Sequence, residues 1–263
     1  MDNFSYVNYC NMIRRVQKHL PIVSFANTLN MEKYCVIRHD VEYSPERALQ
    51  LAHVENKLKI TSTYCFQLRN NTYNALSTRN LEIIREIKSL GHSIGAHIHM
   101  GDCEPGKEEM YILNDIQTLE SYSKIDIEGW SIHRPEGKLL SQYLEIMGNY
   151  INYNGVRFFN YYEEESQRPK LDVTYLADSN HQWKYGDPMN ADLQNIDRLQ
   201  INCHPFSWSP ESLDNTDNFR ILTIEKKREL VSSINDEIKN YPKALYEEEH
   251  NLLDRDRKPT TCR

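Results

Sequence analysis

Carboxylate and imidazole side chains occur in this 263-residue chain at places where short apolar runs end. The first such place is His39-Asp40-Val41-Glu42. Asp40 and Glu42 are two residues apart, so an extended backbone directs both carboxylates to one face. Two neighbouring carboxylates repel each other unless a cation lies between them or one is protonated. The pair can therefore serve a metal or acid–base site, although a solvent-facing strand end would also explain it.

A histidine pair follows in Gly91-His-Ser-Ile-Gly-Ala-His-Ile-His99. On an extended strand His97 and His99 point the same way and lie about 6.6 Å apart along the chain. Both rings can then converge on one metal, and neutral imidazole with carboxylate is a common set of zinc ligands. The alternative is a pair of ordinary surface or core histidines. His92 follows the glycine of a helix-to-strand turn, and we expect it to be structural.

Three later runs also end in residues that can do chemistry. Arg134 follows His133, and an arginine beside a carboxylate keeps it ionised and fixes its direction. His133 is open as a further ligand or a spacer. Asp178 and His204 each close an apolar run, and a histidine oriented by an aspartate is the usual general acid–base arrangement.

Aromatic residues accompany these last two runs, namely Trp183, Phe206 and Trp208. Flat apolar faces of this kind suit sugar rings, and plain core packing is the equal alternative.

The elements that must position these side chains alternate between strand and helix. Helical spacing covers residues 45–57, with Ser44 as N-cap and Pro45 at the first position, then 80–90 and 110–122. Apolar runs that predict strands cover residues 34–39, 61–68, 93–100, 129–133, 173–177 and 199–203, and a final helix is expected near residues 224–240. This alternation predicts parallel βαβ units, in which catalytic groups gather at the C-terminal ends of the strands.

Taken in order, these residues resemble the polysaccharide deacetylases, the NodB-homology family of carbohydrate esterases. The resemblance covers about residues 35–208 and has five parts, none of them specific alone. The five parts are Arg38-His-Asp-Val-Glu42, the glycine-rich run that ends in His97 and His99, Arg134-Pro135, Asp178 with Trp183, and His204-Pro205.

The resemblance implies an α/β fold, a distorted (β/α)7-type barrel, forming a single domain over residues 1–263. It implies that Asp40 is the catalytic base, held by Arg134, and that His204 is the general acid, oriented by Asp178. Glu42, His97 and His99 are the implied ligands of a divalent metal, with zinc the first candidate by ligand type. Trp183, Phe206, Trp208 and Pro135 would line the substrate site.

The implied activity is removal of an N-acetyl or similar acyl group from an amino sugar or oligosaccharide. Two features depart from the family pattern: its histidines are usually spaced i, i+4, whereas position 101 is glycine here, and its metal acid is usually aspartate. Asp102 or His133 could therefore complete the site instead. Another metal-dependent barrel amidohydrolase, or a sugar-binding protein that has lost its metal, are the alternatives.

The net charge, the cysteines and the length of the apolar runs limit the partners and the surroundings expected for the chain. The net charge of −7, with lysine and arginine scattered among acids, argues against a nucleic-acid or anionic-membrane partner. Six cysteines without a CxxC pair favour free thiols, and no stretch approaches the about 18 apolar residues of a membrane span. Since the first twenty residues lack an apolar signal core, we expect a cytoplasmic enzyme and a small activated or oligomeric amino sugar. Arg157, Arg168 or Lys184 could meet a diphosphate, and the oligomeric state is open.

Overall fold

The structure is a computed structural model that describes residues 4–135, 146–155, 157–159, 173–238 and 242. The chain divides into two compact units, residues 1–212 and 213–263. The sheet and all of the candidate site residues belong to the first unit. The expectation of one catalytic domain over residues 1–263 stays a prediction.

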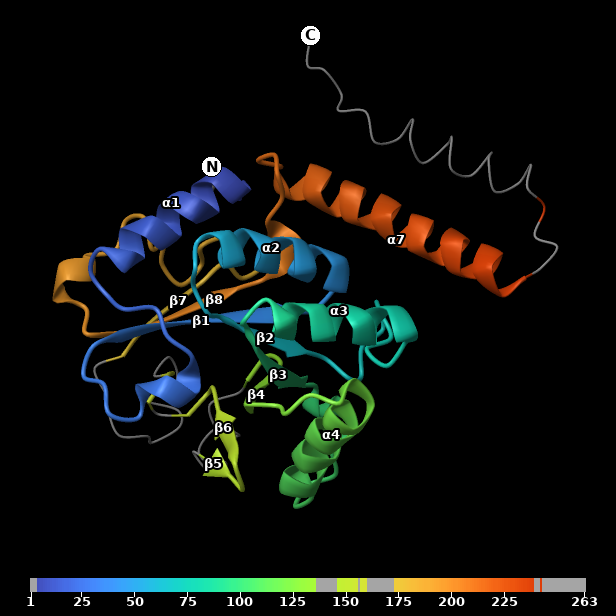
Figure 1. Cartoon of the computed structure of the whole chain (residues 1–263), viewed down its shortest axis with the longest axis horizontal. Helices are drawn as coiled ribbons and strands as arrows, with labels where there is room; N and C mark the ends of the chain where they lie inside the picture. Colours follow the sequence, from blue (N-terminus) through green and yellow to red (C-terminus); the bar gives the residue numbers. More distant parts are fainter. Residues whose placement is uncertain (1–3, 136–145, 156, 160–172, 239–241, 243–263) are drawn as a thin grey trace, which may run out of the picture. The chain divides into compact units, whose positions relative to one another are not determined.

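One eight-stranded sheet forms the first unit, in the order β5-β6-β4-β3-β2-β1-β8-β7. Every neighbouring pair is parallel except β5 with β6. Seven of the described strands are thus parallel. The sheet that they form is curved (Figure 1), which confirms the expected distorted (β/α)7-type architecture. The strands are β1 Tyr34–Val41, β2 Thr63–Phe66, β3 Ser93–Ile98, β4 Gly129–Ile132, β5 Ile146–Met147, β6 Tyr150–Asn152, β7 Thr174–Ala177 and β8 Arg198–Cys203.

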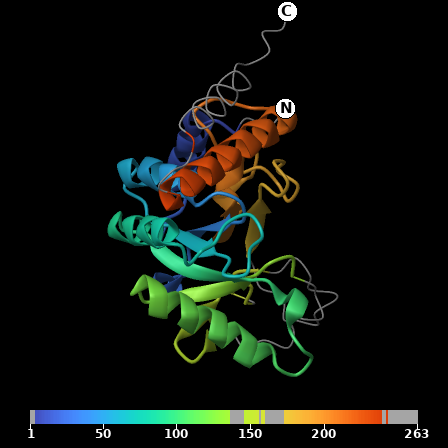
Figure 2. The same cartoon turned by 90° about the vertical axis from the view of Figure 1, so that its right-hand side faces the viewer.

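Four α-helices of this unit follow one another along one side of the sheet (Figures 1 and 2). Each contacts the next, as α1 does α2, α2 does α3 and α3 does α4. Their bounds are α1 Tyr6–Gln17, α2 Pro45–Lys57, α3 Thr78–Ser89 and α4 Glu108–Ser123, and short 3-10 turns lie at η1 Phe25–Thr28, η2 Met100–Asp102, η3 Leu193–Asn195 and η4 Pro205–Ser207. Helix α2 begins as expected, because the Ser44 hydroxyl accepts the Arg47 N–H and Pro45 occupies the first turn.

Strand β1 shows how the alternation of a strand places the site. Tyr34 and Val36 pack in an apolar cluster with Phe25, Tyr153 and Phe158. Further along the same face come Arg38, Asp40 and Glu42, since every second side chain points the same way. The opposite face carries Cys35, Ile37, His39 and Val41, which are all buried. The face of β1 that carries Asp40 is therefore apolar at the start of the strand and charged at its C-terminal end.

Two glycines allow the apolar cluster to close. A Cβ atom on Gly129 would lie 2.2 Å from the Ile151 carbonyl oxygen, and one on Gly95 would lie 2.8 Å from both the Cys65 sulfur and the Tyr153 ring. Strand β3 thus carries a glycine at its third residue, and β4 begins with one, because the Tyr153 ring approaches both closely.

The second unit contains helix α7, Asn215–Glu237, which begins earlier than the expected residue 224. The Asp214 side chain caps it by accepting the Asp217 N–H. Among the described residues, no helix is both long and apolar enough to cross a membrane. The five cysteines in the described part of the chain, Cys10, Cys35, Cys65, Cys103 and Cys203, are free thiols, as expected.

Candidate active site

Asp40 lies at the centre of the charged end of β1. Its Oδ2 atom accepts hydrogen bonds from Arg38 Nη2 at 3.0 Å and from Asn202 Nδ2 at 2.9 Å. Its Oδ1 atom faces Ser131 Oγ at 3.4 Å and His97 Nδ1 at 3.5 Å. Burial by itself would raise the pKa of Asp40, but Arg38, His97 and His204 together lower it well below the usual range. The carboxylate is therefore ionised and held in one direction.

Glu42, His97 and His133 form a second group beside Asp40. One ligand atom from each lies within 4.8 Å of the other two. Glu42 Oε1 is 3.0 Å from His133 Nδ1 and 3.8 Å from His97 Nε2. Burial would raise the pKa of Glu42, yet hydrogen bonds from His133 and His97 lower it strongly. One carboxylate with two imidazoles is a donor set that suits a divalent metal such as zinc.

The orientation of His97 also fits a ligand. Its Nδ1 atom shares a hydrogen bond of 2.8 Å with Ser131 Oγ, which leaves Nε2 to face Glu42 and His133. A ligating histidine usually has its other nitrogen fixed by such a partner. Burial lowers the pKa of His97, although the Asp40 charge opposes this, so the neutral ring that a metal requires is favoured.

His204 is held as the sequence predicts. Asp178 Oδ1 accepts the His204 Nδ1 hydrogen bond at 2.7 Å and the His204 backbone N–H at 2.8 Å. Asp178 Oδ2 accepts from Trp208 Nε1 at 2.8 Å, which fixes the carboxylate in turn. Burial would lower the pKa of His204, but Asp178, Glu42 and Asp40 raise it to about 9. The Nε2 atom lies 4.0 Å from Glu42 Oε1, on the same side as the ligand group.

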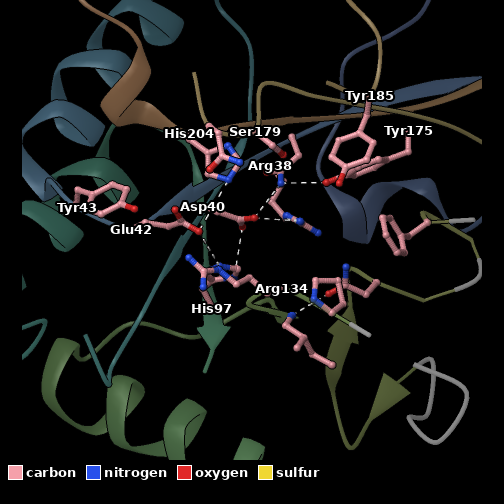
Figure 3. Close-up of a pocket in the computed structure, with 16 residues that line it drawn as sticks. Arg38, Asp40, Glu42, Tyr43, His97, Arg134, Tyr175, Ser179, Tyr185 and His204 are labelled. Carbon is pink, nitrogen blue, oxygen red and sulfur yellow. Dashed lines mark hydrogen bonds and ion pairs between the residues drawn. The ribbon is translucent and has the colours of Figure 1, made fainter. Parts of the chain in front are cut away.

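A cavity of about 400 Å³ joins these groups. Figure 3 shows Asp40 between Arg38 and His97, with His204 close by and the Tyr175 and Tyr185 rings on the Arg38 side. The sequence-predicted residues that line the cavity are Asp40, Glu42, His97, Arg134, Pro135 and His204, and its aromatic walls are Tyr43, Phe159, Tyr175 and Tyr185.

His99 lies outside the ligand group. Strand β3 ends at Ile98, and His99 instead caps the following turn, where its Nδ1 atom accepts the Gly101 N–H at 3.3 Å. A Cβ atom on residue 101 would lie 2.7 Å from the His99 ring, so a larger residue there would require that ring to move. The expected pairing of His97 with His99 fails because the strand ends one residue too early. The second histidine of the ligand group is His133, which the sequence left open as a further ligand or a spacer.

Arg134 lines the cavity, but the guanidinium bound to Asp40 is that of Arg38. Arg134 has a left-handed backbone, with φ of 50°, just after β4. Arg38 lies two residues before Asp40 on the same strand face, so its side chain runs alongside the carboxylate. This corrects the expectation that Arg134 is the partner of Asp40.

Two of the three expected substrate-stacking aromatics, Trp208 and Trp183, belong to the apolar cluster that includes helix α1. Trp208 is fully buried and contacts Phe4 and Tyr9 edge to face. Trp183 stacks on Phe4, with ring centroids 6.2 Å apart. Phe206 is buried against Tyr43, which itself lines the cavity. The core-packing alternative applies to all three.

Two of the cations considered for a diphosphate, Arg157 and Lys184, are not among the residues that line the cavity. Arg157 donates to the Thr28 carbonyl at 3.1 Å, and the Lys184 ammonium lies over the Tyr185 ring at 5.3 Å. Arg168 is outside the described residues.

Sequence reasoning missed Arg38, Asn202, Ser131 and the cavity tyrosines. Arg38 could have been found from its i, i+2 spacing to Asp40. Asn202 lies two residues before His204 on β8, and Ser131 two residues before His133 on β4. Their contacts cross between strands, so they depend on strand order, which no single segment reveals.

No family model and no curated protein matches this chain. Among solved structures it is similar to a family 4 acetyl xylan esterase from Clostridium thermocellum bound to cobalt (14% identity, 65% of this chain and 73% of that chain, TM-score 0.38). It is also similar to a family 4 carbohydrate esterase from Bacillus anthracis (12%, 82% and 85%, 0.39) and to the chitin deacetylase of Colletotrichum lindemuthianum (9%, 75% and 84%, 0.38).

Proposed function

We propose that this protein is a metal-dependent hydrolase that removes an acyl group from an amino sugar. The observation that carries the proposal is the arrangement around Asp40. An ionised carboxylate outside the ligand group lies 3.5 Å from His97 of that group. His204, held by Asp178, faces the same cavity. A hydrolase needs these three parts together: a ligand group, a base and an acid.

The fit to a metal is argued from the donors themselves. Glu42, His97 and His133 supply one oxygen and two nitrogens, and three protein ligands leave a position for water or substrate. We infer zinc as the first candidate. When bound there, a divalent ion supplies Lewis-acid polarisation of the acyl oxygen and a water of lowered pKa.

The residues of the chain then divide the proton transfers. Asp40, kept ionised by Arg38 and Asn202, takes a proton from the attacking water. His204 donates a proton from Nε2 to the departing amine, because Nδ1 is fixed by Asp178. Tyr175 and Tyr185 offer flat faces for the sugar ring on the other side of the cavity.

The proposal is tested by measuring acetate release from a panel of N-acetylated sugars and polymers with zinc-loaded protein. We expect release from at least one small amino sugar or oligosaccharide. Metal analysis of the same samples should give about one ion per chain. Bound zinc with no acetate from the whole panel would reject the hydrolase assignment and favour a sugar-binding protein.

A further inference from the structure

The ring of Phe4 contacts both loops that carry the candidate acid, His204, and its partner Asp178. Its centroid lies 4.3 Å from that of His181, in the loop that follows Asp178. It lies 5.1 Å from that of Trp208, in the loop that follows His204, and meets it edge to face. Phe4 is fully buried and does not line the cavity. It therefore joins the two loops outside the space that is open to a substrate.

The segment that carries Phe4 is also bonded to the second loop through its backbone. The Ser209 N–H donates to the Phe4 carbonyl at 3.1 Å, and the Tyr6 N–H donates to the Ser209 carbonyl at 2.9 Å. Helix α1 continues this segment, and its Tyr9 ring meets the Trp208 ring edge to face at 4.8 Å. The segment therefore holds Trp208 by ring contacts and by the backbone next to it.

Trp208 in turn contacts Asp178. Its Nε1 atom donates to Asp178 Oδ2 at 2.8 Å, whereas Asp178 Oδ1 accepts both bonds from His204. Both oxygens of this fully buried carboxylate are thus occupied, and a buried carboxylate that loses a donor must turn to find another. Because the two oxygens define the plane of the carboxylate, the Trp208 bond fixes the direction in which Oδ1 meets the His204 ring.

The backbone of the loop after Asp178 also depends on its contacts. Asn180 and His181 both have left-handed backbones, with φ of 57° and 58°. Residues other than glycine adopt this conformation less readily, so the surrounding structure must hold it. The Phe4 ring packs on His181, and it therefore supports this turn as well as the position of Trp208.

The position of the acid matters most when the leaving group is poor. When the acyl C–N bond of an amide breaks, its electron pair stays on nitrogen, and the proton from His204 Nε2 makes the departing group a neutral amine. The acyl carbon keeps the oxygen of the attacking water and leaves as a carboxylic acid, which ionises. In 4-nitrophenyl acetate the electron pair of the C–O bond stays on an oxygen that leaves as a stable phenolate, so no proton is required.

We propose that Trp208 and Phe4 are positioning residues for the general acid. They act through Asp178, and they govern the cleavage of amides far more than that of activated esters. This inference rests on the proposed function for the role of His204. The segment before helix α1 thus contributes to turnover from outside the cavity.

The rates of the zinc-loaded full chain on two substrates test the inference. One is the N-acetylated sugar that the wild type cleaves fastest, and the other is 4-nitrophenyl acetate. Trp208→Phe keeps an aromatic ring but removes the N–H. It should lower kcat on the sugar about tenfold relative to the ester, with KM nearly unchanged. His204→Ala should lower the same ratio about 10²-fold or more, and Phe4→Leu should lower it by a smaller factor than Trp208→Phe.

The hydrogen-bonded Nδ1 proton of His204 gives a second readout that needs no turnover. In isotope-labelled protein it should give a far-downfield proton resonance, assigned by its loss in His204→Ala. Trp208→Phe should shift or broaden this resonance, because the carboxylate that accepts the proton is then free to turn.

Trp183→Phe is the matched control. Trp183 packs in the same cluster, 6.2 Å from the Trp208 ring, and the bonds of Asp178 go to His204 and Trp208. This variant should keep the wild-type ratio and resonance.

Equal losses on both substrates in Trp208→Phe, or an unchanged ratio, would overturn the positioning role, as would a resonance that stays in place. Should Trp208→Phe not fold, Phe4→Leu is judged by the same criteria. Absence of acetate from every sugar in the wild type would reject the hydrolase, and the resonance then decides the positioning of His204 by itself.

Discussion

The two faces of β1 carry similar chemistry with opposite accessibility. On the helix side, Glu55 of α2 accepts hydrogen bonds from the Tyr9, Ser62 and Tyr64 hydroxyls and shares one of 2.9 Å with His39 Nε2. All of these residues are buried. On the cavity side, Glu42 is 17% exposed, and its Oε1 atom faces the imidazoles of His133, His97 and His204.

The difference between Glu55 and Glu42 shows when a carboxylate–histidine pair can bind a metal ion. Glu55 has its lone pairs occupied by four partners from four segments, so it joins helices to strands and leaves no position for a ligand. Glu42 has oxygens that face two histidines, with a cavity beside them. A buried charge with all its partners specifies packing, whereas one whose partners are themselves ligands can take up an ion.

The largest effect is expected on the cavity face. Asp40→Asn should lower turnover about 10²- to 10⁴-fold, the usual range for losing a general base, while zinc content stays near the wild-type value. Steady-state kinetics with elemental analysis would check both. Loss of zinc together with activity would place Asp40 among the ligands instead.

On the helix face, Glu55→Gln should reduce the free energy of unfolding by about 3–5 kcal/mol, because it breaks a buried charged network. Urea unfolding measures this. The fraction that folds should still bind zinc, since Glu55 lies on the other side of the strand from Glu42. A variant as stable as the wild type would show that the network adds nothing to the fold.

The next largest effect distinguishes His133 from His99 as the second histidine ligand. His133→Ala should weaken zinc binding by more than about 100-fold, beyond the loss seen when only a supporting residue is removed. His99→Ala should keep an affinity much closer to that of the wild type, because His99 stacks on His133 but offers no atom to the ligand group. Competition with a chelator would rank the two variants, and the reverse ranking would restore the pair expected from sequence.

The smallest expected effect is a loss of the stability contributed by Glu55 at acidic pH. Burial would raise the pKa of Glu55, but His39, His92 and Ser62 lower it from 4.5 to about 2. Its contribution to stability is therefore complete above pH 4.5 and is lost as the pH falls toward 2. The difference in unfolding free energy between wild type and Glu55→Gln should shrink across that interval, by at most about 1.4 kcal/mol per pH unit. A difference that stays constant with pH would exclude titration of Glu55.

Much of the fold could be predicted from local signals. Helix α2 was placed at its true bounds, because a serine cap and a proline mark its start. Helix α1 was missed, although Tyr9, Met12, Ile13 and Val16 have helical spacing and are buried. That omission explains the aromatic error as well, since α1 and the residue before its cap supply the partners of Trp208.

The site was predictable where alternation along one strand defines it, and at the Asp178–His204 pair that the family resemblance implied. Alternation along β1 correctly placed Asp40 and Glu42 on one face, and Asp178 correctly contacts His204. The same alternation failed at His99, because the strand ended at Ile98. The i, i+2 spacing of Arg38 and Asp40 could have favoured Arg38 over Arg134, whereas the left-handed backbone of Arg134 after β4 is seen only in the structure.

The loop of residues 67–72 lines a cavity of about 460 Å³ beside Glu42 and His133, and this has a consequence for engineering. The side chains of Asn70 and Thr72 donate hydrogen bonds to the backbone oxygen of Glu42 itself. The same two bonds therefore hold both the loop and a candidate metal ligand. Exchanging this loop for another sequence would remove both hydrogen bonds that hold the Glu42 backbone. Changes of substrate range in this scaffold should therefore begin with Asn71, whose side chain can vary while those two bonds stay intact.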